Sequence, residues 1–99
     1  MAKIKLTAWD SAKYLKTEED IKRYFEACIE EDPGDGSLIR TGLGNIARAK
    51  NMAQLARDTG LAREGLYKAL SMEGNPEFST IMKVITALGL SLKAERTAA

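Results

Sequence analysis

The sequence predicts an all-α protein: a single domain of about five helices, with a short strand at its C-terminal end. Three observations lead to this prediction. The chain has 99 residues, the length of one domain. Its composition, 44% hydrophobic and 29% charged, is that of a folded globular protein. Apolar residues recur with helical spacing in several stretches, whereas the alternation typical of strands occurs only near the end.

The N-terminal part of the chain predicts two helical segments. Asp10 can cap a short helical turn over 11–15. Trp9 is expected to fold back onto the core, the alternative being that it anchors a partner protein. A longer helix is expected after Thr17, which forms a capping-box pattern with Asp20. Its apolar face has the helical period and is made of Ile21, Tyr24, Phe25, Cys28 and Ile29.

A connector separates this helix from the next. The helix is expected to end near Glu31, because Pro33 and glycines follow. A calcium loop starting at Asp32 is excluded, since glycines occupy two positions that need oxygen ligands. Ser37 can cap the following helix. The apolar face of that helix is made of Ile39, Leu43, Ile46 and Ala47, with Leu38 beside them.

Two glycines lie inside this second long helix. Gly42 and Gly44 each lower its stability by about 1 kcal/mol relative to alanine. Either they allow close packing against a neighbour, or the helix begins later than Ser37. Asn51 is a suitable residue for its C-terminal end.

The stretch 52–70 contains two short helical patterns separated by Gly60. A residue that tolerates positive φ lets the chain turn one helix steeply across another. Ala56 is small where the second helix would cross the first. The pattern therefore predicts a helix-turn-helix with helices over 52–59 and 62–70. Its apolar anchors are Met52, Leu55, Leu61, Leu66, Ala69 and Leu70.

The second helix of this motif has a polar face that suits DNA. In a helix-turn-helix, the first residues of the second helix enter the major groove. Arg63 can donate two hydrogen bonds to guanine, and Glu64 can accept one from cytosine or orient Arg63. Tyr67 and Lys68 can reach a base edge or a phosphate. Gly65 has no side chain, so the helix is narrower where it would face DNA. The alternative is a helical hairpin that uses the turn only for packing.

The C-terminal part predicts one more helix. After a loop over 72–77, the helical period returns in Phe78, Ile81, Met82, Ile85 and Leu88. Gly89 can end this helix in a left-handed conformation. The alternation over 90–95 predicts a short strand that pairs with a second copy across a dimer axis, or with another protein. The alternative is a frayed terminus.

The net charge of +1 conceals an asymmetry. Residues 1–36 have six basic and nine acidic side chains, whereas residues 37–99 have nine basic and five acidic ones. An acidic front and a basic back indicate two different binding roles.

Several functional classes are excluded by residue content. The chain has no histidine, which removes imidazole catalysis and most zinc sites. Its single cysteine, Cys28, lies on an apolar helix face and is expected to be a buried thiol. We therefore expect no enzyme activity, catalytic residue, metal or cofactor. No signal peptide or membrane span is apparent, so a cytoplasmic location is expected.

The segment GNIARAKNMAQLARDTGLAREGLYKALSMEGNPEFSTIMKVITALGL resembles the Cro/C1-type helix-turn-helix domain. More narrowly, it resembles bacterial addiction-module antidote proteins, the antitoxins of HigA type. The similarity extends upstream through YLKTEEDIKRYFEACIEE and covers about 80 residues. The most specific pieces are GLAREGLYKALS and GNPEF.

This resemblance implies a homodimeric repressor that binds a double-stranded DNA operator ahead of its own operon. It also implies neutralisation of a small RelE-like toxin, which would bind elsewhere, on the acidic N-terminal helix. The expected organisation is an N-terminal helical extension over 1–36, packed on a DNA-binding domain over 37–96. Residues matching the recognition helix are Ala62, Arg63, Glu64, Tyr67 and Lys68, and residues at expected phosphate-contact positions are Gln54, Arg57, Ser71 and Asn75.

One departure concerns Glu64, an anion in a helix aimed at DNA. It weakens binding unless it accepts from cytosine or orients Arg63. Two alternatives remain open: a stand-alone prophage-type repressor without a toxin, and a protein-interaction module that does not bind DNA.

Overall fold

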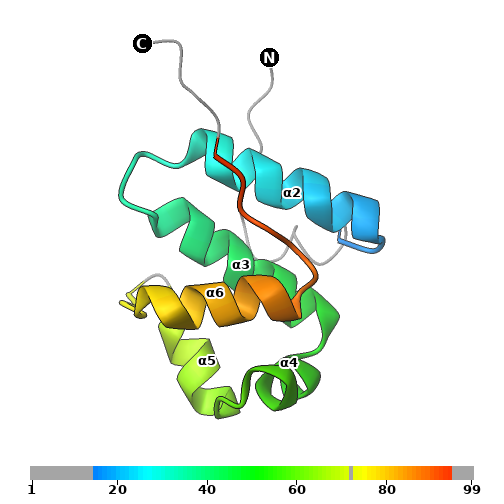
Figure 1. Ribbon diagram of the computed structural model, residues 1–99, viewed down its shortest axis with the longest axis vertical. Coiled ribbons are helices and arrows are strands. Elements are labelled where there is room, and N and C mark those ends of the chain that lie inside the picture. Colours follow the sequence, from blue (N-terminus) through cyan, green and yellow to red (C-terminus); the bar gives the residue numbers. More distant parts are fainter. Residues whose placement is uncertain (1–14, 72, 95–99) are drawn as a thin grey trace.

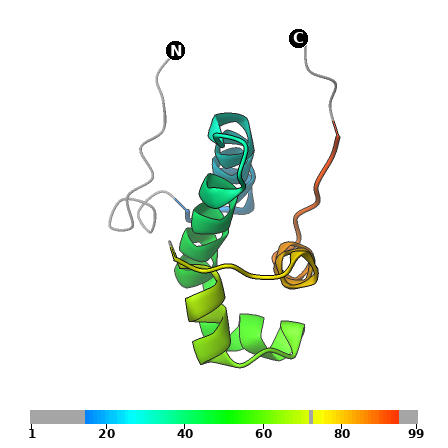
Figure 2. The same ribbon diagram turned by 90° about the vertical axis from the view of Figure 1, so that its left-hand side faces the viewer.

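The computed structural model describes residues 15–71 and 73–94, and this part of the chain is all-α (Figure 1). Its helices are α2 (Glu18–Glu31), α3 (Ser37–Lys50), α4 (Met52–Thr59), α5 (Arg63–Ala69) and α6 (Phe78–Ala87). The helices α2 and α3 form an antiparallel hairpin, and α6 crosses α3 (Figures 1 and 2). The pair α4 and α5 lies at the end of the molecule opposite α2. The predicted all-α class is confirmed.

The central helix of the fold is α3, which packs against α2, α4 and α6. Its side chains Leu43 and Ile46 are fully buried. The core contains most residues of the apolar faces predicted from the helical period, together with Val84, which the prediction for α6 did not include. Its buried members are Leu15, Ile21, Tyr24, Phe25, Cys28, Leu43, Ile46, Ala47, Met52, Leu55, Leu66, Leu70, Val84, Ile85 and Leu88.

The start of α2 has the predicted capping box. The N–H of Asp20 donates to the Thr17 hydroxyl at 3.0 Å, and the N–H of Thr17 donates to the Asp20 carboxylate at 3.1 Å. Two of the backbone groups that a helix start leaves unpaired are thereby satisfied. The Thr17 N–H is also the main cause that holds the pKa of Asp20 below its usual value.

The start of α3 is capped by a residue of the preceding connector, so the prediction of a Ser37 cap is wrong. Ser37 is the first helical residue, and Gly36 is the N-cap, with φ of 80° and no side chain to accept a hydrogen bond. The carboxylate of Asp32 takes this role because the turn brings it beneath the helix end. It accepts from Gly34 at 2.8 Å, Gly36 at 2.9 Å, Leu38 at 2.9 Å and Ile39 at 3.3 Å.

The two glycines inside α3 are sites of close packing. A Cβ built on Gly42 would collide with the side chain of Cys28 on α2. A Cβ on Gly44 would lie 2.7 Å from the carbonyl oxygen of Leu70. Because the helix does begin at Ser37, close packing is the correct one of the two explanations.

Two residues predicted to lie on buried apolar faces are exposed instead. Ile29 is 38% exposed and Phe78 is 71% exposed, although the helical period placed both on apolar faces. Each lies in the terminal turn of its helix, where the neighbouring helix no longer covers that face.

The ends of α3 and α6 also depart in part from expectation. Asn51 follows α3 as predicted, but its backbone is extended, and its side chain accepts from the N–H of Gln54 at 3.1 Å, so it caps α4. Gly89 ends α6 with φ of 76°, as predicted. Residues 90–94 form neither helix nor strand, so the predicted strand is not found there. The rest of the described chain contains no strand either.

Two predictions for the N-terminal part lie outside the described residues. These are the placement of Trp9 and the turn over 11–15 capped by Asp10, of which only Leu15 is described. Within the described ranges, the structure contains no helix with the length and apolar character needed to cross a membrane.

Candidate nucleic-acid interface

The connection between α4 and α5 is a tight turn held by its own hydrogen bonds. Gly60 has φ of 75°, and its N–H donates to the carbonyl of Ala56 at 2.9 Å. The Thr59 hydroxyl donates to the carbonyl of Leu55 at 2.8 Å and accepts from the N–H of Leu61 at 3.3 Å. The positive φ predicted for Gly60 is thus confirmed, and the direction of α5 relative to α4 is fixed locally.

The inner side of α5 is anchored in the core. Leu66 is fully buried and Leu70 is 1% exposed. On α4, Met52 and Leu55 are buried and Ala56 is half-buried, as the sequence predicted. Because one side of α5 is fixed in this way, its other side has a defined outward direction.

The outer side of α5 presents the residues that the sequence placed at a base-contacting surface. Ala62 is the extended N-cap, and the helix itself begins one residue later than predicted. The remaining four lie within the first six positions of the helix. All five are exposed: Ala62, Arg63, Glu64, Tyr67 and Lys68.

The exposed ions on α5 do not pair with each other. Both ion pairs found among the described residues use carboxylates of α2, and neither contains Arg63 or Glu64. Glu64 therefore does not orient Arg63 in the described structure, which was one of the two roles considered for it. The Arg63 guanidinium keeps its donors available for an external acceptor.

The candidate phosphate contacts on α4 form a short side-chain network. Arg57 donates to the side-chain oxygen of Gln54 at 2.7 Å, and the amide nitrogen of Gln54 donates to Asp58 at 2.8 Å. The Gln54 amide thus holds Arg57 in place while leaving most of its guanidinium donors available. Both Gln54 and Arg57 are exposed.

The other two candidates follow α5. The Ser71 hydroxyl donates to the Lys68 carbonyl at 2.8 Å, which ties it to the last turn of the helix. Asn75 lies exposed in the segment that leads to α6. The structure thus places these two after α5 and the Gln54–Arg57 pair on α4.

Two residues that position this segment were missed by sequence reasoning. Arg40 on α3 donates from Nε to the Ser71 carbonyl at 3.0 Å. Gly74 packs so closely on the carbonyls of Lys68 and Ala69 that a Cβ would collide with them. Neither contact has a local sequence signal, because Arg40 is 31 residues from its partner and the Gly74 contact depends on the path of the loop.

The described residues hold no cluster of metal-ligating side chains. The Cys28 thiol is fully buried, and burial is the first cause that raises its pKa to about 12. A thiol of this kind is protonated at neutral pH and therefore a poor nucleophile.

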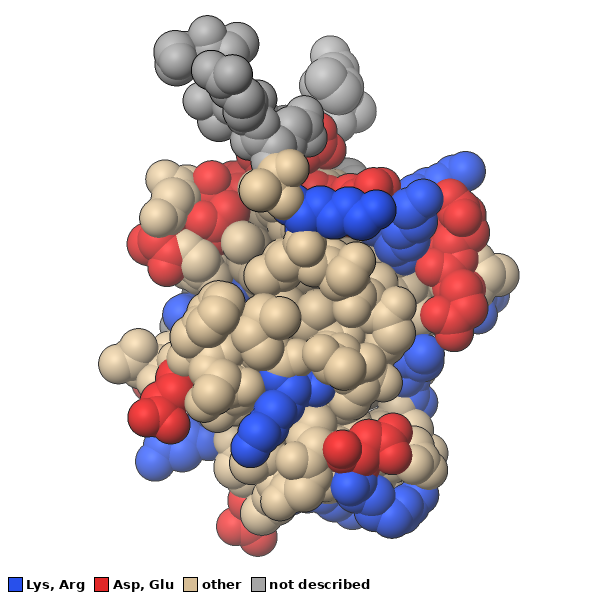
Figure 3. Space-filling model, in the orientation of Figure 1, with Lys and Arg blue, Asp and Glu red and all other residues tan. Residues whose placement is uncertain are grey.

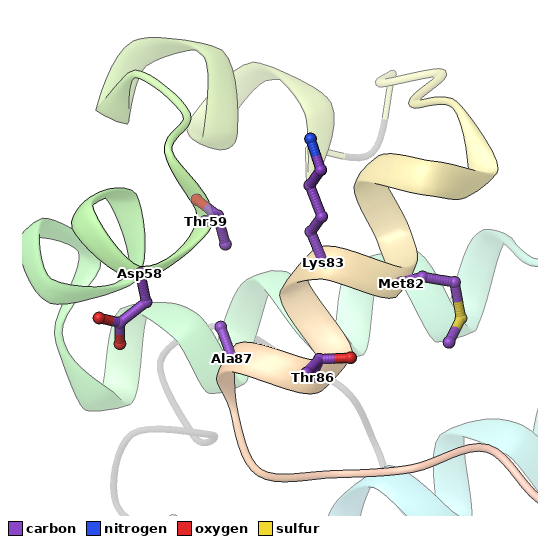
Figure 4. A pocket seen from close by; sticks show the side chains of 6 residues that line it. All are labelled: Asp58, Thr59, Met82, Lys83, Thr86 and Ala87. Carbon is purple, nitrogen blue, oxygen red and sulfur yellow. The ribbon is translucent and has the colours of Figure 1, made fainter.

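A shallow open hollow of about 440 Å³ lies between the end of α4 and α6 (Figure 4). Its lining is Asp58, Thr59, Met82, Lys83, Thr86 and Ala87. Figure 4 shows the charged ends of Asp58 and Lys83 directed apart rather than toward a common point. Since a small-molecule site needs convergent polar groups, we assign no chemistry to this hollow.

Comparison with known proteins gives two matches. A family described as "Probable addiction module antidote protein" matches residues 5–96, a range that includes all five described helices. An uncharacterized protein of Haemophilus influenzae (strain ATCC 51907 / DSM 11121 / KW20 / Rd) is 49% identical over 92 residues, which is 93% of each chain. No solved structure matches the chain.

Proposed function

Because the chain belongs to the family of probable addiction module antidote proteins, we propose that it is an antitoxin that binds operator DNA through α5. In this role it represses its own toxin–antitoxin operon and neutralises a RelE-like toxin. One observation carries the DNA-binding part: Gly60 turns α5 across α4 so that Leu66 is buried while the polar side of α5 faces solvent.

The shape and chemistry of α5 fit a DNA major groove. The groove is about 12 Å wide and admits an α-helix with its side chains. Arg63 and Glu64 lie in the first turn of α5, the part that reaches base edges in a helix-turn-helix. Arg63 would donate to guanine O6 and N7. Since Glu64 does not pair with Arg63, we assign it to the amino group of cytosine.

Polar residues on α4, on α5 and in the segment after α5 would position the protein on the DNA backbone. Arg57, held by Gln54, offers a cation on α4, and Lys68 offers another on α5. Ser71 and Asn75 add neutral donors on the segment after α5. Such contacts fix the register of the helix on the duplex without reading sequence.

A homodimer would present two copies of α5 to half-sites one DNA turn apart. The surface best suited to hold two copies together is on α6, whose only charged residue is Lys83. Phe78 on α6 is 71% exposed. Figure 3 shows a broad uncharged area across the middle of this face. An exposed apolar side chain such as Phe78 within an uncharged area favours an association surface.

The toxin would bind at α2, at the opposite end of the molecule from α4 and α5 (Figure 1). The resemblance implies that the RelE-like toxin is a ribonuclease, and a protein that binds RNA needs a basic surface for this polyanion. The exposed side of α2 has Glu26 and Glu30 beside the partly exposed Ile29, and so combines negative charge with an apolar contact. Charge complementarity of this kind speeds association and favours the correct partner.

A gel-shift experiment tests the DNA-binding part. The probe is the DNA immediately upstream of the gene, compared with a scrambled fragment at two salt concentrations. We expect selective binding that weakens as salt rises, because binding releases counterions from DNA. Arg63→Ala should lower affinity for the upstream fragment by about 5- to 150-fold, the equivalent of about 1–3 kcal/mol.

Arg23→Ala is the matched control, since Arg23 is an exposed arginine on α2 that forms an ion pair with Glu19 on the same helix. It should leave DNA affinity unchanged. Equal, weak binding of wild-type protein to both fragments would refute operator binding. An Arg63→Ala protein with wild-type affinity would refute the assignment of α5 as the reading helix.

A further inference from the structure

Gly65 on α5 is a glycine that the fold does not explain. All eight glycines of the chain lie within the described residues, and seven have a structural reason. Four have positive φ, and three have neighbours that leave no room for a Cβ. The first group is Gly34, Gly36, Gly60 and Gly89, and the second is Gly42, Gly44 and Gly74.

Gly65 belongs to neither group. Its φ is not positive, and a Cβ built on it would meet nothing within 4 Å apart from its chain neighbours and the backbone of its own helix. It lies inside a helix of seven residues, between the exposed Glu64 and the buried Leu66. Glycine is a poor helix former compared with alanine, and short helices depend more on each residue. The isolated protein would therefore be more stable with alanine at this position.

An external surface is the remaining physical reason for the absent side chain. Lys68 lies one turn further along α5, so the bare backbone at Gly65 has an exposed cation as its neighbour. The nearest exposed residues before it are Arg63 and Glu64. A surface that comes close to the α5 backbone at Gly65 would therefore lie beside Lys68 and Arg63, which favour a polyanion. The wall of a DNA groove is such a surface.

We infer that Gly65 is a close-approach point at which the wall of the DNA major groove contacts the backbone of α5. This inference rests on the proposed function and deepens it. Without a Cβ, α5 can lie deeper in the groove, which brings the ends of Arg63 and Glu64 within hydrogen-bonding distance of base edges. Gly65 is then a positioning residue: it reads no base itself, and it sets the depth from which its neighbours do.

The test is to add a side chain and to measure stability and DNA binding separately on the full chain. Gly65→Ala should raise the melting temperature by several degrees, roughly 4–8 °C, through better helix propensity. It should lower affinity for the upstream DNA by about tenfold or more, because a well-packed contact has no room for an added group. Gly65→Leu, another good helix former, should lower affinity further.

The salt dependence separates this effect from a lost charge. Gly65→Ala removes no cation, so the slope of log affinity against log salt should stay at the wild-type value. Lys68→Ala should reduce that slope by about one phosphate contact. Thr41→Ala, at a half-buried position on α3, is the control for added helix propensity and should leave DNA affinity unchanged.

The outcomes distinguish this inference from the proposed function. If wild-type protein binds selectively and Gly65→Ala binds equally well or better, the close-approach role is wrong and operator binding stands. A fall in melting temperature for Gly65→Ala would show that the fold itself needs this glycine, which also overturns the inference. Loss of toxin binding with retained DNA affinity would assign Gly65 to a protein contact instead. If the wild-type protein does not bind selectively, both proposals fail.

Discussion

Replacing Asp32 by alanine tests how the central helix begins. The change removes the two carboxylate oxygens that accept four backbone N–H groups, two of them in the first turn of α3. Loss of a single capping side chain costs about 0.5–2 kcal/mol. Gly36 at the N-cap has no side chain to compensate, so we expect the upper end, about 2 kcal/mol. In a domain of this size that lowers the melting temperature by roughly 8–16 °C.

The pH dependence of this loss follows from the folded-state pKa of Asp32. Burial pushes that pKa upward, but the N–H groups that donate to the carboxylate outweigh it, and the net pKa is below the usual value. A lowered folded pKa gives stabilisation that is complete above the unfolded pKa, about 3.9, and is lost as pH falls through the folded pKa. The difference between wild type and Asp32→Ala should therefore be full at pH 7 and shrink below about pH 4.

Thermal unfolding followed by circular dichroism from pH 7 to pH 2 measures both effects. Asp32→Asn keeps one acceptor oxygen and should lie between wild type and Asp32→Ala at pH 7. Glu26→Ala, an exposed carboxylate in the middle of α2, is the control and should unfold like wild type. Equal melting temperatures for wild type and Asp32→Ala at pH 7, or a difference that does not change with acid, would refute the capping role.

Three further predictions concern the turn between α4 and α5 and the packing of α2 on α3. Gly60→Val should lower the free energy of unfolding by about 1–3 kcal/mol in urea titrations, because a β-branched residue is strained at a φ of 75°. Gly60→Asn should lower it less, and equal stability of both variants would contradict this prediction. Cys28 should resist a thiol reagent at pH 8 in the folded protein and react on unfolding, since its thiol is fully buried and burial raises its pKa to about 12. Rapid labelling of the folded protein would refute this burial. Asn45→Ala should destabilise by about 1–3 kcal/mol, because it removes a buried hydrogen bond to Tyr24 at 2.8 Å and a partly buried one from Arg48 at 2.7 Å. Wild-type stability of this variant would show that these bonds contribute nothing.

Local patterns predicted most of the helices correctly. The capping box of Thr17 and Asp20, the turn at Gly60 and the end of α6 at Gly89 were all recognisable, because each depends on residues within one helical turn of it. The apolar period identified the buried faces of α2, α3 and α6. It failed at Ile29 and Phe78, because a period shows which face is apolar but not where the neighbouring helix ends.

The candidate interface was predicted less completely. The exposed residues of α5 followed from helical geometry once Leu66 was recognised as buried. The Arg40 bond to the Ser71 carbonyl was not predictable, since it joins residues 31 positions apart. The alternatives for Glu64 could not be separated by sequence, because neighbouring residues on a helix point in different directions and only the folded side chains show which ions meet.

The sequence by itself determined which segments are helical, the left-handed turn at Gly60 and the polar face of α5, because these depend on local backbone preferences and a period of 3.6 residues. Only the tertiary structure decided that Asp32 rather than Ser37 caps α3, that Gly42 and Gly44 are packed, and that Gly65 is not. The physical reason is that a cap, a collision or an empty space depends on atoms brought together from different parts of the chain.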